Sequence, residues 1–88
     1  MKIKAGFTLQ PFADQWVAIP DKQVQMPRGT VVAFNDVGRF LWELLQQECS
    51  VEELTKQILA NYEVTEEKAC EDVLRFVEQL GAGNLLEY

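Results

Sequence analysis

Residues 34–45 read FNDVGRFLWELL, and the pattern of polar and apolar residues changes at the second position of this stretch. Asn35 suits a helix N-cap, and Asp36 in the next turn suits the positive end of the helix dipole. From there the apolar residues recur at helical spacing and share one face: Val37, Phe40, Leu41, Leu44 and Leu45. The stretch therefore predicts a helix from Asn35 to about Gln47, and it separates a β-rich part of the chain from a helical part.

The residues before Asn35 have the composition and alternation of β-strands. Residues 7–10 alternate apolar and polar side chains, and residues 16–19 are rich in aromatic and β-branched residues. Residues 12–15 between them are few enough to form a hairpin turn. A third run, residues 30–34, is β-prone and uncharged, which makes it a pairing hazard at a sheet edge unless it is covered or used.

Two more helices are predicted after the first. Ser50 and Glu53 fit a capping box, which indicates a helix beginning there. A third helix is predicted over residues 65–80, with Gly81 in the C′ position that follows a helix. The leucines at 85–86 are expected to fold back onto the core.

These elements predict a single α+β domain over residues 1–88, with a three-stranded N-terminal antiparallel sheet followed by a three-helix bundle. Three strands and three helices of this kind can form a winged helix-turn-helix-like fold. A chain of 88 residues buries only about 60–65% of the surface that its unfolded form exposes. Most apolar residues must therefore serve one small core, and few are left to line a deep pocket.

The composition excludes several kinds of chemistry. The chain has no His, so a Ser-His-Asp triad, a Cys/His zinc site and a histidine pH switch cannot be built from it alone. Cys49 and Cys70 form no C-x-x-C pair, and ordinary packed or surface thiols are expected. No catalytic residue set, metal site or cofactor site is predicted. The N-terminal residues do not resemble a signal peptide and no apolar run could span a membrane, so the cytoplasm is the expected compartment.

The net charge of −6 is unevenly distributed. Residues 1–42 carry +2, from five basic and three acidic residues, whereas residues 43–88 carry −8, from three basic and eleven acidic residues. A winged helix that binds DNA needs basic side chains on the helix that enters the groove. DNA binding is therefore the less favoured alternative, and a structural subunit of a larger enzyme complex is another.

The third helix has an apolar arc of about 160°, wider than the stripe of a one-sided surface helix. Its members are Phe76, Ala69, Leu80, Val73, Val77, Cys70 and Leu74. One interpretation is that the helix packs against both the sheet and the other helices. The other is that one margin of the arc forms half of a groove for a partner. In that case an extended peptide would pair with the strand at 30–34 and place alternate side chains against the helix.

The order of motifs resembles that of PqqD-like proteins. Residues 34–45 are similar to the signature Asn-(acidic)-x-Gly-x-x-(aliphatic)-Trp-x-x-Leu, with Asn35, Gly38 and Trp42 at its defining positions. The N-terminal Phe-x-Leu strand, the Ser-Val-Glu-Glu-Leu segment, the Tyr-Glu-Val segment and the closing Gly-x-x-Leu-Leu follow in the same order, so the resemblance covers essentially the whole chain. Arg39 stands where the resemblance leads us to expect a small residue.

The resemblance implies a winged-helix-like fold and a non-catalytic role as a recognition element for precursor peptides. Members of the family bind the leader region of a ribosomally made peptide between the third strand and the third helix, and present it to a modifying enzyme, often a radical SAM protein. The member that names the family serves coenzyme PQQ synthesis. The resemblance also implies that Asn35, Gly38 and Trp42 are scaffold residues and do not contact the peptide. The residues expected to bind the peptide are Thr30, Val31, Val32, Ala33 and Phe34 of the strand and Val73, Phe76, Val77 and Leu80 of the helix. A monomer or a homodimer joined through the edge strand is expected.

Overall fold

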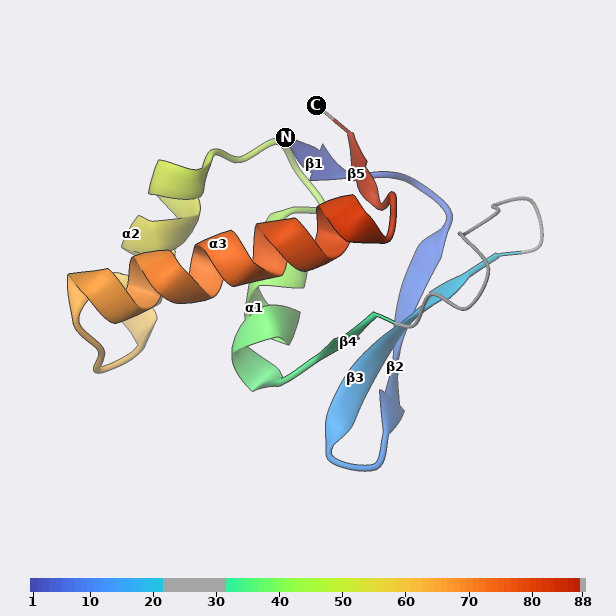
Figure 1. The fold of residues 1–88 in the computed structure, drawn as a ribbon, viewed down its shortest axis with the longest axis horizontal. Coiled ribbons are helices and arrows are strands. Elements are labelled where there is room, and N and C mark those ends of the chain that lie inside the picture. Colours follow the sequence, from blue (N-terminus) through green and yellow to red (C-terminus); the bar gives the residue numbers. More distant parts are fainter. Residues whose placement is uncertain (22–31, 88) are drawn as a thin grey trace.

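The computed structural model describes residues 1–21 and 32–87. It is an α+β structure with three helices and two small antiparallel sheets, and the helices lie to one side of the three-stranded sheet (Figure 1). In chain order the elements are β1 (Lys2–Ile3), β2 (Phe7–Phe12), β3 (Gln15–Pro20), β4 (Ala33–Phe34), α1 (Asp36–Leu44), α2 (Val51–Asn61), α3 (Glu66–Ala82) and β5 (Leu86–Glu87). The prediction of three helices after an antiparallel sheet is confirmed, but the strands are divided between two sheets.

The larger sheet has the strand order β2-β3-β4, and its hairpin was correctly predicted. Phe12 lies opposite Gln15, so Ala13 and Asp14 form a two-residue turn. Ala13 has φ 56°, a left-handed conformation that is unusual for alanine. The described part of the predicted third strand is β4, and residues 30–31 of that prediction lie outside the described residues.

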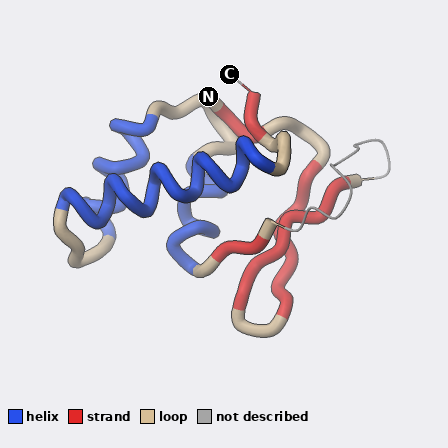
Figure 2. Tube along the Cα trace, viewed as in Figure 1, coloured by secondary structure: helices blue, strands red, loops and turns tan. Residues whose placement is uncertain are grey.

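The smaller sheet joins the two ends of the described chain, and sequence analysis missed it. Lys2 pairs with Glu87 and Ile3 pairs with Leu86. The Ile3 N–H also donates to the carbonyl of Leu45, at 2.9 Å, which ties β1 to the residue after α1. Figure 2 shows this pair of strands, near the two ends of the chain, apart from the three-stranded sheet.

The first two helices begin at their predicted N-caps, and the third begins at Glu66, with Thr65 as its N-cap rather than its first residue. The side chain of Asn35 accepts a hydrogen bond from the Gly38 N–H, that of Ser50 from the Glu53 N–H, and that of Thr65 from the Lys68 N–H. The Ser50 hydroxyl also donates to the Glu53 carboxylate, at 3.1 Å, which completes the capping box.

The helix ends differ from their predicted positions. α1 ends at Leu44 rather than near residue 47. α3 continues through Gly81 to Ala82, so the prediction that Gly81 follows the helix was wrong. The left-handed residue after α3 is Asn84, with φ 62°, and asparagine tolerates this conformation better than other non-glycine residues. The chain then turns back and buries Leu85, as predicted.

The core lies where α1, α3 and β4 meet. Phe34 is 3% exposed, and its ring centroid lies 5.8 Å from that of Trp42 and 5.1 Å from that of Phe76. Trp42 is therefore a core residue, which agrees with the scaffold role expected for it. Gly38 allows this packing, because a Cβ added there would come within 2.6 Å of the Phe34 Cβ.

Candidate functional site

The backbone of β4 offers hydrogen-bonding groups on the side away from β3. The Ala18 N–H donates to the carbonyl of Val32 at 3.0 Å, so these two residues form a hydrogen-bonded pair. Hydrogen-bonded and non-hydrogen-bonded pairs alternate along an antiparallel ladder. The neighbouring pair, Val17 and Ala33, is therefore non-hydrogen-bonded. The N–H and carbonyl of Ala33 consequently point away from β3, toward an edge that pairs with no strand among residues 1–21 and 32–87, called the open edge below.

A cleft of about 210 Å³ lies beside this edge, between β4, the start of α1 and the second half of α3. The buried rings of Phe34 and Phe76 contribute to its lining, together with Leu41. Its other lining residues are Gln15, Ala33, Asn35, Val37, Gly38, Asp72, Arg75 and Gln79. The cleft thus combines an apolar floor with a mainly polar rim.

One polar side chain already reaches the strand edge. The side-chain amide of Gln79, on α3, donates to the carbonyl of Ala33, with 3.5 Å between nitrogen and oxygen. Because this carbonyl points away from β3, the contact confirms independently that the open edge of β4 faces α3. In Figure 1, β4 accordingly lies between α3 and the hairpin.

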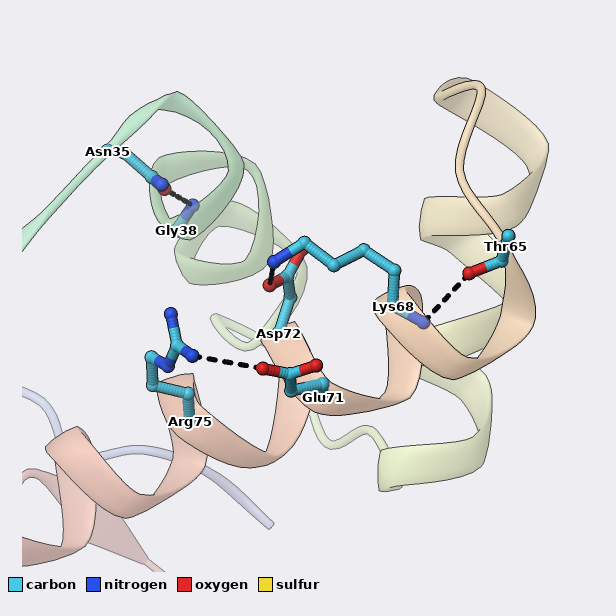
Figure 3. Close-up of polar contacts among 7 residues, drawn as sticks. All are labelled: Asn35, Gly38, Thr65, Lys68, Glu71, Asp72 and Arg75. Atoms are coloured by element: carbon cyan, nitrogen blue, oxygen red, sulfur yellow. Dashed lines mark hydrogen bonds and ion pairs between the residues drawn. The ribbon is translucent and has the colours of Figure 1, made fainter.

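The charged residues on the α3 side of the cleft are held in local ion pairs (Figure 3). Lys68 pairs with Asp72 at 2.8 Å, and Arg75 pairs with Glu71 at 3.1 Å. The charges on the rim are therefore partly neutralised by their partners. Covering these paired side chains with another molecule costs less desolvation free energy than covering unpaired ions.

Near the other end of the cleft, Arg39 takes part in a fixed cluster with the hairpin. Its guanidinium carbon lies 4.2 Å from the centroid of the Trp16 ring, a cation–π geometry. The Trp16 indole N–H in turn donates to Asp36 at 3.3 Å. This stacking gives a physical reason for an arginine where a small residue was expected, because its side chain lies over the hairpin rather than in the core.

The structure places most of the predicted peptide-binding side chains in the core. Five are at most 5% exposed: Val32, Phe34, Val73, Phe76 and Leu80. Ala33 and Val77 are half-buried, and Thr30 and Val31 lie outside the described residues. Of the four helix residues predicted to bind the peptide, Phe76 lines the cleft, and Val73, Val77 and Leu80 are not among its lining residues. Their role in peptide binding stays a prediction.

The exposed part of the apolar arc of α3 does not lie beside β4. The exposed member of the arc is Leu74, whose relative solvent exposure is 52%. Together with Cys70 and three glutamates, Leu74 lines a shallow hollow at the start of α3. At about 100° per residue, Leu74 lies roughly 160° around the helix from Phe76. The apolar margin of α3 therefore faces away from β4, and the rest of the arc is occupied by core packing.

Sequence reasoning missed the polar residues that face β4. Asp72 and Gln79 lie about 40° and 60° from Phe76 around the helix, on the side opposite Leu74. In the sequence, both residues lie next to the apolar stripe of the helix, and this position could have indicated them. The prediction considered only the apolar residues of the helix.

The described residues contain little that resembles a reactive centre. Burial, reinforced by the negative charge of Glu53, raises the pKa of the Cys49 thiol and disfavours its nucleophilic thiolate form. Among residues 1–21 and 32–87, no group of three or more His, Cys, Asp or Glu side chains is placed to hold a metal ion. In the same part of the chain, no helix is long and apolar enough to cross a bilayer.

The fold and the cleft define a small α+β domain with an open strand edge next to a helix. The family described as "Coenzyme PQQ synthesis protein D (PqqD)" matches residues 16–86, and the chain belongs to this family. The structure is similar to that of TbiB1, solved in complex with the TbiA(beta) leader peptide. The TM-score is 0.72 and the sequence identity is 28%, over 99% of this chain and 95% of TbiB1. No curated protein sequence gives a significant match.

Proposed function

We propose that this chain binds the leader region of a ribosomally synthesised precursor peptide, which adds a strand to the open edge of β4. The observation that carries the proposal is the outward-facing backbone of Ala33 beside the cleft. Membership of the PqqD family and the similarity to a protein solved with a leader peptide support the same function.

The binding energy would come from two sources. Backbone hydrogen bonds to the outward N–H and carbonyl of Ala33 would hold the peptide in register. Side chains of the peptide would contact the cleft floor at Phe34 and Phe76. Micromolar affinity requires about 8 kcal/mol, which one added strand with two or three buried side chains can supply. Val73, Val77 and Leu80 would contribute by holding α3 in position.

The further steps of the proposal concern what happens to the bound peptide. The chain would act without catalysis and would present the precursor to a modifying enzyme, such as a radical SAM protein, in the cytoplasm. The scaffold would be of the winged-helix-like type that PqqD-like proteins suggest. Each chain would need only its own β4 edge and α3 to bind one peptide, so a monomer suffices.

A DNA-binding role is a weaker alternative. The three basic residues of residues 43–87, Lys56, Lys68 and Arg75, all lie in ion pairs with acidic neighbours. A phosphate contact would have to break one of these pairs on a surface of the wrong sign. Neither the family nor the structural similarity supports such a role.

The proposal is tested by replacing Ala33 with proline. Proline removes the outward N–H and places its ring at the strand edge, whereas pairing with β3 is unaffected because that N–H does not take part in it. We expect Ala33→Pro to weaken binding of the leader peptide roughly tenfold or more, as measured by fluorescence anisotropy. The peptide would be a labelled synthetic one, with the leader sequence of the precursor encoded next to this chain.

The matched control is Ala33→Thr, which keeps the N–H and suits a strand. It should bind within about twofold of the original chain. Thermal unfolding and the amide NMR spectrum would establish that both variants are folded. A folded Ala33→Pro variant with undiminished affinity would contradict strand addition at β4.

A further inference from the structure

The side chain of Gln79 occupies the place that an added strand would need. It extends from α3 to the outward carbonyl of Ala33, and the two residues are 46 positions apart in the sequence. A strand added to β4 would lie about 4.8 Å from it. The amide nitrogen of Gln79 is 3.5 Å from the carbonyl oxygen, so the side chain crosses this space.

We infer that Gln79 is an internal competitor for the peptide-binding edge, and that a bound peptide must displace it from the carbonyl of Ala33. This inference rests on the proposed function. In the free chain, the Gln79 amide satisfies the outward carbonyl as a peptide N–H would. When a peptide strand arrives, its N–H replaces the amide, and the exposed Gln79 side chain turns toward solvent.

The opposite edge of the same sheet is protected in a different way. In β2, Pro11 lies opposite Trp16, in a pair that the same alternation makes non-hydrogen-bonded. The backbone nitrogen of Pro11 therefore faces away from β3. Because proline has no N–H, an added strand would find no hydrogen-bond donor there. The β2 edge is thus blocked permanently by the ring of Pro11. The β4 edge is covered by the side chain of Gln79, which is free to rotate away.

Competition of this kind sets a threshold for the peptide. A segment that pairs poorly with β4 does not compensate for the lost Gln79 contact, while a well-matched leader does. Removing the amide should therefore tighten the binding of every peptide that pairs with β4 by the same factor, because the cost of displacing Gln79 does not depend on the peptide sequence. Because a neutral hydrogen bond of this length contributes at the lower end of the usual range, we expect a twofold to fivefold gain in affinity.

The test compares two variants of the full chain. Gln79→Ala removes the side chain beyond Cβ, and Gln79→Met keeps its length without the amide. Both residues favour helices, so α3 should be retained. Gln57→Ala, at an exposed position of α2, is the matched control. The probe is the labelled leader peptide defined above, together with a scrambled version of the same composition.

Both Gln79 variants should bind the leader twofold to fivefold more tightly than the original chain and the Gln57 control. Their preference for the leader over the scrambled peptide should stay the same, because both peptides must displace the same Gln79 contact. Unchanged or weaker binding in both variants would overturn the inference. Tighter binding in Gln79→Ala alone would also overturn it, because bulk and not the hydrogen bond would then be the obstacle. Failure of the original chain to bind the leader would instead contradict the proposed function.

Discussion

Gly38 is the residue at which α1 comes closest to β4. An added Cβ would lie 2.6 Å from the Cβ of Phe34 and 3.2 Å from its ring, and Phe34 is fixed by the rings around it. A methyl group here would therefore displace either Phe34 or the whole helix. Since Phe34 also lines the cleft and belongs to β4, this single contact couples the stability of the core to the position of the β4 edge.

We expect Gly38→Ala to lower the free energy of unfolding by about 1–2 kcal/mol, although alanine favours helices. Overpacking a core costs about 1–3 kcal/mol, which exceeds the helix-propensity gain of up to about 1 kcal/mol. Chemical denaturation measures the change. Gly81→Ala, at an exposed position of α3, measures the gain in helix propensity without a packing clash. It should leave the free energy of unfolding unchanged or raise it. If both variants were stabilised equally, the contact with Phe34 would not be the reason for the glycine.

Single residues with local roles were predictable from the sequence, and those with distant partners were not. Asn35 and Ser50 cap their helices as expected, because each cap interacts with a residue three positions along the chain. Gln79 contacts a backbone group 46 positions away, and nothing in its neighbouring sequence indicates that contact.

At the scale of elements, the hairpin β2–β3 contains a local strain that can be tested. Ala13 has φ 56° in the two-residue turn, where glycine is usually preferred. The left-handed conformation costs alanine about 1 kcal/mol or more. We expect Ala13→Gly to stabilise the chain by about 0.5–1 kcal/mol, net of the greater flexibility of glycine in the unfolded state, as measured by chemical denaturation.

Asn84 provides the comparison for this prediction. It also has a positive φ, of 62°, but asparagine tolerates it, and its side chain accepts a hydrogen bond from Lys4 at 3.0 Å. Asn84→Gly should therefore give no gain or a small loss. Destabilisation by Ala13→Gly would show that the turn is not strained by its alanine.

The elements that sequence analysis missed are the shortest ones. β1 and β5 have two residues each, too few to show alternation, and they pair between opposite ends of the described chain. The longer elements were predicted because their periodicity extends over many residues. The end of α3 was misplaced because Gly81 has the residue type expected after a helix, while the left-handed position is taken by Asn84.

At the scale of the whole molecule, the two edges of the three-stranded sheet have opposite properties. The β2 edge carries Pro11 and the β4 edge faces a cleft beside α3. The sequence indicated the uncharged third strand, but it did not indicate that the neighbouring margin of α3 is polar. That margin depends on how α3 rotates against α1 and β4, which is set by the packing of Phe34, Trp42 and Phe76.

The measurement that tests strand addition most directly is amide hydrogen exchange of Ala33, followed by NMR with and without the leader peptide. The Ala33 N–H points away from β3, whereas that of Phe34 faces Trp16 in a hydrogen-bonded pair. At saturating peptide, we expect exchange at Ala33 to slow by roughly tenfold or more, as one new backbone hydrogen bond requires, while exchange at Phe34 changes much less. Bound peptide that leaves the exchange of Ala33 unchanged would contradict the addition of a strand at β4.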